Sequence, residues 1–532
     1  MPARGTVPGM RTLTALLTAC AATAIAAGCA SPAPPPVDDS VVRTVDGAVR
    51  GTVTDDVRRF QGIPYAAAPV GALRWRSPEP AKAWPDVRDG TRPGAPCPQA
   101  WPGEDGTPQV SGSEDCLFLN VTTPSGAVGP RPVMVFVHGG GFTGGQGAPY
   151  DPTRVVTQGG VVVVTMNYRL GALGFLAHPA FDDPAAGNFG LADQQAALRW
   201  VRDNIAAFGG DPGNVTLWGE SAGAFSTCAQ LAAPSARGLF HKAIVQSGPC
   251  ANPVVTREEA QRRGVTTAAE LGCPDTGDTV ACLRALPPAA FAGRYDERVY
   301  QQVHRDLAAR PWLPVAGTPA LPQHPVDALR AGTAADVPMI HGGTRDEARS
   351  HVAMAYDMVG SPLTAGQYPQ VVAALFGADA DAVVAGYPVS RFPSPGLALA
   401  TALSDDGRTV GACTQQQVVD TASGPVFTYE FAEPVDDVIG SVPMGAHHGA
   451  DVRYFFDSAF PGAPPASRTA EEDALAGRLI GYWTAFAATG SPGPDWPVAD
   501  GATVLQIDAE GSRPIDLAAE HRCDFWRSLP SR

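Results

Sequence analysis

Near its middle the chain reads Val215-Thr216-Leu217-Trp218-Gly219-Glu220-Ser221-Ala222-Gly223. An apolar run ends in a G-x-S-x-G pentapeptide, and a helix-compatible segment, Ala224–Leu231, follows it. This order of strand, turn and helix is typical of a nucleophile elbow, in which two glycines permit a turn too tight for a Cβ atom and the serine is exposed at its tip. The pattern predicts that Ser221 attacks an acyl carbon.

Further continuous apolar runs lie on both sides of this stretch, at residues 133–137, 161–166, 243–246, 337–340 and 426–431. Runs without polar alternation indicate strands that are buried on both faces of a sheet. Before the elbow, apolar residues recur at helical spacing from Leu191 to Ile205. This alternation predicts an α/β fold with a mostly parallel central sheet flanked by helices. In such sheets the chemistry lies at the carboxyl ends of the strands.

A glycine-rich segment, His138-Gly139-Gly140-Gly141-Phe142, directly follows the run at 133–137. Three glycines let the backbone approach a bound carbonyl group closely. The position of the segment, one strand–loop unit before the elbow, matches the H-G-G-G oxyanion motif of esterases. We therefore expect the N–H groups of Gly140, Gly141 and Ala222 to hold the oxyanion.

Two later segments offer an acid and a base. Asp346 and Glu347 follow the run at 337–340, whereas His447 and His448 lie in the loop of residues 445–451. The order of serine, acid and histidine is that of α/β-hydrolases and differs from the orders in chymotrypsin and subtilisin. The chemistry alone does not choose between Asp346 and Glu347, or between the two histidines.

Four further blocks point to one family: Ser113–Val121, Asn167–Gly171, Gly187–Gln194 and Cys523–Trp526. Ser113–Val121 is similar to an E-D-C-L-x-L-N signature, and the other blocks follow in the same order over nearly the whole chain. With the elbow, they resemble the type-B carboxylesterases, the family that also contains the cholinesterases. The resemblance implies a single large α/β-hydrolase domain, at residues 41–532, and hydrolysis of carboxylic esters through an acyl-enzyme.

The resemblance also implies roles for the ambiguous residues. The family's acid corresponds to Glu347, and its base, in the motif H-G-x-[ED], corresponds to His448 with Asp451 at the last position. The implied catalytic triad is therefore Ser221, Glu347 and His448. One departure is Ala348, where glycine is usual in the family.

The family pattern further implies three disulfides, Cys97–Cys116, Cys273–Cys282 and Cys413–Cys523. Cys228 and Cys250 lie outside that pattern. Cys228 falls on the predicted elbow helix and Cys250 just after the next strand. The sequence is therefore consistent with either a fourth disulfide or two buried thiols.

Other functions on the same fold are a lipase, an amidase or carbamate hydrolase, a specialised toxin esterase, and a non-catalytic cholinesterase-like binding or adhesion protein. The complete triad favours an enzyme. A cholinesterase is disfavoured because the loop between Cys97 and Cys116 is short and its only tryptophan, Trp101, lies near the wrong end for stacking on choline. We expect the substrate to be selected by loops with little sequence signal: Trp101–Ser111, Val254–Leu271 and Pro311–Pro325.

Composition excludes some partners. The net charge is −15 and no basic cluster is present, so a nucleic-acid partner is not expected. The sequence has no HExxH motif, no CxxC pair and no P-loop, and we expect neither a metal nor an organic cofactor. The expected partner is a small-molecule ester.

The first residues have the features of an export signal. Arg4 and Arg11 precede or border an uncharged apolar run, Leu13–Ala27, that is short for a membrane span. Ala26-Ala27-Gly28-Cys29 resembles a bacterial lipoprotein box, although Ala26 stands where leucine is usual. We expect a signal peptide at residues 1–29 with Cys29 lipidated, a proline-rich tether at 30–40, and an exported enzyme anchored to the outer face of the cell membrane. The alternative is a simple cleaved signal and a secreted protein.

Overall fold

The computed structural model describes residues 38–102, 108–126, 129–273, 277–292, 312–406, 410–419, 421–457, 468–501 and 503–530. The chain divides into two compact units, Met1–Asp38 and Asp39–Arg532. The predicted signal peptide, its Cys29 and most of the predicted tether lie outside the described residues. The following description concerns the second unit.

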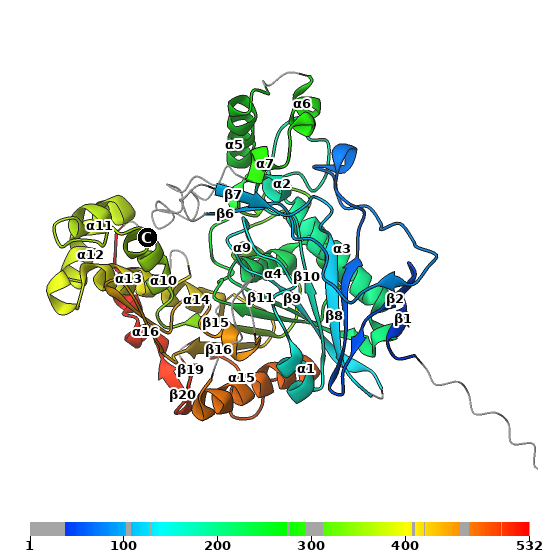
Figure 1. The fold of residues 1–532 in the computed structure, drawn as a ribbon. Helices are drawn as coiled ribbons and strands as arrows, with labels where there is room; N and C mark the ends of the chain where they lie inside the picture. The colour runs from blue at the N-terminus through cyan, green and yellow to red at the C-terminus, as the bar shows by residue number, and fades with distance from the viewer. Residues whose placement is uncertain are drawn as a thin grey trace, which may run out of the picture. The chain divides into compact units, whose positions relative to one another are not determined.

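Within the described residues, eleven strands form one central sheet in the order β20-β19-β16-β15-β12-β11-β9-β10-β8-β4-β3 (Figure 1). Their bounds are β3 Thr52–Val53, β4 Val57–Pro64, β8 Phe118–Pro124, β9 Arg131–Val137, β10 Val162–Met166, β11 Gly210–Glu220, β12 Lys242–Gln246, β15 Met339–Thr344, β16 Val426–Phe431, β19 Thr503–Asp508 and β20 Gly511–Asp516. Neighbouring strands run parallel from β10 to β19, and the strands beyond them at both edges run antiparallel.

The apolar runs of the sequence are strands of this sheet, and the predicted α/β fold is confirmed. Consecutive residues of a strand are buried on opposite faces, as the alternation of side chains in a strand requires. On β11, Leu217 belongs to one hydrophobic cluster and Trp218 to the other. The helices α3 (Phe189–Asn204) and α4 (Ala222–Ala232) pack into the first cluster, and α1 (Thr153–Gly159) and α15 (Ala470–Thr489) into the second.

A separate group of helices packs around a third hydrophobic cluster, beside the carboxyl end of β15 (Figure 1). Its members are α10 Ala348–Val352, the π-helical turn Ala353–Asp357, α11 Tyr368–Phe376, α12 Ala380–Gly386, α13 Pro395–Asp406 and α17 Cys523–Arg527. The stretch Tyr368–Arg391 is long and apolar enough for a membrane span by composition. It is broken at Gly377, however, and Tyr368, Val383 and other members are buried in this cluster.

The remaining elements, apart from the 14-residue helix α5, are short. Helices are α2 Gly171–Phe175, α5 Arg257–Glu270, α6 Thr279–Ala285, α7 Ala289–Ala292, α9 Pro325–Arg330, α14 Ala412–Val419 and α16 Leu517–Glu520. Small sheets join β1 Val41–Arg43, β2 Ala48–Arg50 and β5 Arg88–Asp89; β6 Gln99–Pro102 and β7 Pro108–Ser111; β13 Val255–Thr256 and β14 Val315–Ala316; and β17 Val435–Ile439 and β18 Val442–Gly445.

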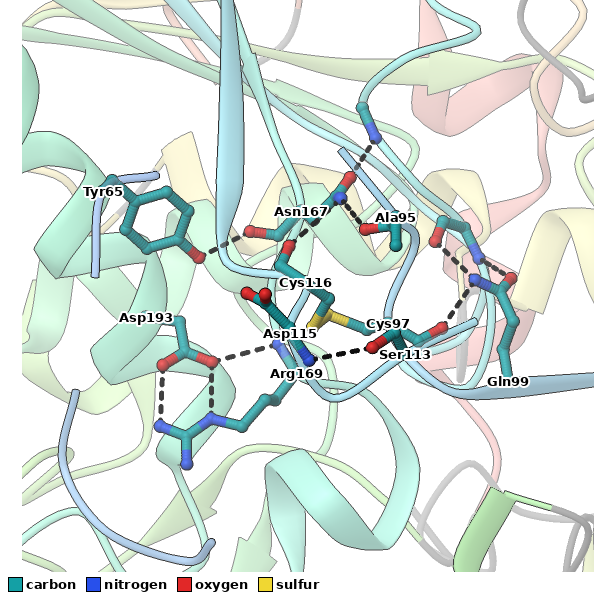
Figure 2. Close-up of a disulfide and its surroundings, with 12 residues drawn as sticks. Tyr65, Ala95, Cys97, Gln99, Ser113, Asp115, Cys116, Asn167, Arg169 and Asp193 are labelled. Carbon is teal, nitrogen blue, oxygen red and sulfur yellow. Dashed lines mark hydrogen bonds and ion pairs between the residues drawn. A yellow bond between two sulfur atoms is a disulfide. The ribbon is translucent and has the colours of Figure 1, made fainter. Parts of the chain in front are cut away.

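Three of the four sequence blocks that carried the family resemblance, Ser113–Val121, Asn167–Gly171 and Gly187–Gln194, meet around the Cys97–Cys116 pair (Figure 2). Asn167 donates from Nδ2 to the carbonyl oxygens of Ala95 and Cys116, at 3.0 and 3.2 Å, and accepts from the N–H of Gly147 at 2.9 Å. Gln99 bonds both the N–H and the carbonyl oxygen of Gly145. These amides therefore fix the far end of the glycine-rich loop that begins at His138.

Arg169 and Asp193, from two of the same blocks, form a buried ion pair (Figure 2). Arg169 donates to the carboxylate from Nε at 2.8 Å, from Nη2 at 2.7 Å and from its backbone N–H at 3.0 Å. Such a bidentate pair has a fixed geometry. It ties the segment after β10 to α3 and so supports the loop from behind.

Eight cysteines lie in four pairs at disulfide distance. Three pairs are those that the resemblance implied. The fourth is Cys228 with Cys250, for which the sequence left two buried thiols as the alternative. It links the elbow helix α4 to the segment that follows β12.

Candidate active site

Ser221 lies at the turn between β11 and α4, with the dihedral angles of a strained elbow, φ 55° and ψ −124°. Its backbone N–H donates to the carbonyl oxygen of Gln246 at 2.9 Å. Both glycines of the motif are sterically required. A Cβ atom on Gly219 would overlap the carbonyl group of Gly223, and one on Gly223 would overlap that of Val137.

Glu347 and His448 meet although 101 residues separate them in sequence. Nδ1 of His448 donates to Oε2 of Glu347 at 2.5 Å. The other carboxylate oxygen of Glu347 accepts from the N–H of Thr344 at 2.8 Å, and Gly343 leaves room for it. The carboxylate is buried and therefore holds one orientation of the imidazole.

Asp346 and His447, the alternatives left open by the chemistry, have other contacts. Asp346 pairs with Arg349 at 2.7 Å and accepts from the N–H of Ala446 at 3.0 Å, while its own N–H donates to the carbonyl oxygen of Ala446. His447 donates from Nδ1 to the carbonyl oxygen of His448. These residues join the loop that carries the acid to the loop that carries the base.

Nε2 of His448 faces the elbow, 3.5 Å from Oε1 of Glu220, the neighbour of Ser221. Within the described residues, no hydrogen bond joins Oγ of Ser221 to His448. Such bonds are often long in sites without substrate and tighten when it binds. The serine, the imidazole and the acid thus lie at one end of the sheet.

The glycine-rich loop packs directly against the elbow. A Cβ atom on Gly139 would lie 2.9 Å from Cβ of Ser221, so this approach needs glycine. Gly140 and Gly141 have positive φ angles, 101° and 61°, which glycine adopts readily. Ala222 is the first residue of α4, and its N–H is one of the unpaired donors of a helix start. Ala222 thus adjoins Ser221, and Gly140 and Gly141 follow the residue that packs against it.

Two acidic residues adjoin the triad, and sequence reasoning gave neither a catalytic part. Glu220 is buried beside His448. Asp451 is buried too, and accepts from Nε2 of Gln246 at 2.8 Å and from the hydroxyl of Tyr429 at 3.2 Å. The signal for Glu220 was available, since it lies inside the elbow motif, but only the folded loop brings it to the imidazole.

The three carboxylates set the charge state of the imidazole. Burial lowers the pKa of His448, but the charge and hydrogen bond of Glu347, with the charges of Glu220 and Asp451, outweigh burial and raise this pKa to about 9. Burial raises the pKa of Glu220 to about 7 and that of Asp451 to about 6. Each negative charge here favours the imidazolium that forms when His448 takes a proton.

His351, on α10, is a second residue that the sequence did not single out. Its ring centroid lies 4.9 Å from that of His448, and its Nδ1 donates to the carbonyl oxygen of Glu347 at 3.2 Å. It therefore packs against the imidazole of the predicted base. Of the three loops expected to select substrate, 254–271 is described throughout, whereas 101–111 and 311–325 include residues outside the described ranges.

Among the described residues, no group of three or more His, Cys, Asp or Glu side chains is arranged to hold a metal ion. The polar groups at the elbow are instead a hydroxyl, an imidazole, carboxylates and backbone N–H donors, the set used in acyl transfer.

Comparison with known proteins identifies the family. The model of the carboxylesterase family matches residues 38–371 and 397–526. Fumonisin B1 esterase from Sphingopyxis macrogoltabida is 34% identical over 472 residues, covering 86% of this chain and 83% of that protein. Para-nitrobenzyl esterase from Bacillus subtilis is 42% identical over 320 residues, covering 58% and 63%.

A solved structure of a PNB esterase superposes with a TM-score of 0.76 at 31% sequence identity, covering 92% of this chain and 100% of that one. The family model and this structure span the sheet, the elbow and both loops that carry the acid and the base. The chain therefore belongs to the carboxylesterase family and is a carboxylic ester hydrolase.

Proposed function

We propose that Ser221, His448 and Glu347 hydrolyse carboxylic esters through an acyl-enzyme. His448 takes the proton of the Ser221 hydroxyl as Oγ attacks the ester carbonyl carbon. The carbonyl oxygen becomes an oxyanion, which the N–H groups of Gly140, Gly141 and Ala222 stabilise. His448 then donates its proton to the alcohol, which leaves.

Water hydrolyses the acyl-enzyme by the same route. His448 takes a proton from the water, the hydroxide adds to the acyl carbon, and Oγ of Ser221 leaves with the proton that His448 returns. Glu347 accepts the Nδ1–H bond throughout and stabilises the imidazolium without taking its proton.

One observation carries this proposal. Nδ1 of His448 is bonded to a buried carboxylate at 2.5 Å, while Nε2 is directed to the turn that holds Ser221. A histidine fixed in this tautomer has its basic nitrogen on the side of the nucleophile.

Two substitutions test the nucleophile. Ser221→Ala should lower ester hydrolysis by at least about 10³-fold, because the oxyanion donors and substrate binding alone remain. A phosphonate probe should add its mass to the peptide that holds Ser221 and to no other serine peptide. Activity within about tenfold of the wild type in Ser221→Ala would refute this mechanism.

The substrate class is a small-molecule ester. The names of two relatives include an esterase of a fumonisin and an esterase of a para-nitrobenzyl compound. Nitrophenyl esters of increasing acyl length, together with matched amides and carbamates, would separate an esterase from a lipase, an amidase or a carbamate hydrolase. We expect the nitrophenyl esters to be hydrolysed and the matched amides not to turn over measurably.

We also propose export with a lipid anchor at Cys29. The apolar run, the imperfect lipoprotein box and the proline-rich tether support this proposal. Four cysteine pairs at disulfide distance are typical of a protein from an oxidising compartment. Mass spectrometry of the mature N-terminus tests it: a diacylglyceryl group on Cys29 is expected, and an unmodified N-terminus elsewhere would contradict the anchor.

A further inference from the structure

A pocket of about 300 Å³ lies beside the loop that carries Glu347, within the third hydrophobic cluster's helices. Its walls come from the start of α10, the segment after α12, the second half of α13 and the residues before α17. Ser221, His448 and the glycine-rich loop do not line it, so it is separate from the active site. The volume is at the lower end of the range for small-molecule sites.

Cationic side chains gather around this pocket in a protein whose net charge is −15. They are Arg345, Arg349, Arg391, Arg522 and His521. His521 is buried between two carboxylates, bonding Asp405 from Nδ1 at 2.7 Å and Glu430 from Nε2 at 2.6 Å. Because both nitrogens donate, this imidazole is a fixed cation in the pocket floor.

The buried acids near the pocket already have partners. Asp405 also accepts from the hydroxyl of Tyr387 at 2.7 Å, and Glu430 also pairs with Arg345 at 3.1 Å. Asp346 is bonded to Arg349 and to the backbone of Ala446. Glu520 is exposed at the rim. The side chains of His521, Arg345 and Arg349 are therefore each paired with a carboxylate.

Two guanidinium groups remain, those of Arg391 and Arg522. Among the described residues, neither has a carboxylate partner. Arg522 is nevertheless held in place. It lies 4.8 Å over the ring of Tyr387 and 5.0 Å over that of Phe525, and Nη1 donates to the carbonyl oxygen of Gly386 at 2.8 Å.

The backbone around Arg522 is also fixed. The residue has a positive φ of 53°, which is uncommon for a side chain of this size, and the next residue is Cys523 of a disulfide-distance pair. An arginine that is oriented by two rings, with most of its N–H donors unused, is preorganised to bind an anion.

The pocket includes a part of the chain that the family pattern does not cover. The carboxylesterase model matches residues 38–371 and 397–526 and leaves out 372–396. Gly386, Tyr387, Arg391 and Phe392 of the pocket wall lie in that gap.

We propose that this pocket binds a small organic anion whose carboxylate or phosphate groups are held by Arg391 and Arg522. A guanidinium group matches the oxygen spacing of a carboxylate or a phosphate and binds it through two parallel N–H bonds. His521 is already paired with Asp405 and Glu430, so the attraction for an anion comes from Arg391 and Arg522. The ligand is separate from the ester substrate, and its binding does not depend on the triad.

Calorimetric titration of the full chain tests this site with citrate, with inorganic phosphate and with glycerol as the neutral control, all at one ionic strength. At least one of the two anions, citrate or phosphate, should bind saturably with a stoichiometry of one per chain, and glycerol should not bind. Tighter binding of citrate would identify a carboxylate ligand, and tighter binding of phosphate a phosphorylated one.

Variants locate the site. Arg391→Gln and Arg522→Gln should each weaken binding by at least about tenfold, the effect of losing a charge-assisted pair of hydrogen bonds. Arg522→Lys, which retains the charge without the fork, should weaken it less. Arg262→Gln is the matched control, because Arg262 is an exposed arginine of α5 that does not line the pocket. This variant should bind the anion as tightly as the wild type does.

Since Ser221→Ala leaves the pocket intact, it should bind the anion normally, which separates this site from the active site. Unsaturable binding, no binding, or equal binding by the wild type and both glutamine variants with unchanged thermal stability would overturn the proposal.

Discussion

The imidazoles of His448 and His521 both donate from Nδ1 to a buried carboxylate, yet they differ at Nε2. In His448 this atom lies 3.5 Å from Glu220 and faces the elbow, and 13% of the side chain is exposed. In His521 it donates to Glu430 at 2.6 Å, and 6% is exposed. One imidazole has a nitrogen available for proton transfer, whereas the other has none. The number of ring nitrogens that are hydrogen-bonded to a carboxylate, one in His448 and two in His521, therefore separates a base from a structural cation.

The largest effect on activity is expected from removing Nε2 of His448. His448→Gln should lower kcat/KM for a nitrophenyl ester by about 10⁴-fold, because no group then takes the proton of Ser221. His447→Gln is the matched control, since His447 lies in the same loop but bonds a backbone carbonyl.

The control should retain activity within about tenfold. If His447→Gln lost as much activity as His448→Gln, with both proteins folded by circular dichroism, the assignment of the base would be wrong.

Removing the imidazole of His521 should lower the stability of the fold and leave catalysis unchanged. His521→Gln leaves Asp405 and Glu430 buried without their shared cation, and we expect a loss of about 3 kcal/mol in the free energy of unfolding. Urea denaturation measures it. The turnover of the folded fraction should stay near that of the wild type, and a selective loss of turnover would show that His521 acts in catalysis.

The same residue predicts how stability changes with pH. Burial lowers the pKa of His521, but its bonds to Asp405 and Glu430 outweigh burial and raise this pKa to about 10, against 6.5 for an ordinary histidine. A raised pKa stabilises the fold fully below pH 6.5, and this contribution disappears as the pH rises towards 10.

The difference in unfolding free energy between the wild type and His521→Gln should therefore shrink from neutral pH to about pH 10. A difference that stays constant over this range would mean that His521 is not charged in the folded protein.

The smallest effect is expected on the pH dependence of activity, from Glu220, whose carboxylate lies 3.5 Å from Nε2 of His448. Its negative charge raises the pKa of His448, so Glu220→Gln should lower that pKa and make the base available at lower pH. We expect the acidic limb of the pH profile of kcat/KM to move down by about one pH unit. Glu258→Gln, on the exposed first turn of α5, should leave the limb in place. A limb unmoved in Glu220→Gln would separate this carboxylate from the titration of His448.

Most of the sheet and the chemistry of the elbow could be predicted from the sequence. Strands buried on both faces are continuous apolar runs, and the glycines of Gly219–Gly223 are needed locally for the turn. Asp346 and Glu347 could not be separated on chemistry alone, because the difference is which carboxylate meets an imidazole about a hundred residues later.

The cluster around His521 had no sequence signal. Its partners lie 116 and 91 residues away, and a single histidine before a cysteine has no characteristic spacing. The helices of residues 368–406 were missed for a related reason: they form a satellite core of their own, and nothing in their pattern connects them to the elbow.

The paired backbone bonds between Asp346 and Ala446 have a practical consequence for engineering. They fasten the two ends of a hundred-residue excursion of the chain at a single point. Lengthening a loop whose ends are already held costs little, about 0.6 kcal/mol for each doubling of its length. Residues 372–396 lie within that excursion and outside the family pattern, but Val383 and Tyr387 are buried in the third hydrophobic cluster. An inserted segment is therefore best placed at the exposed turn of Gly377 and Ala378, between α11 and α12.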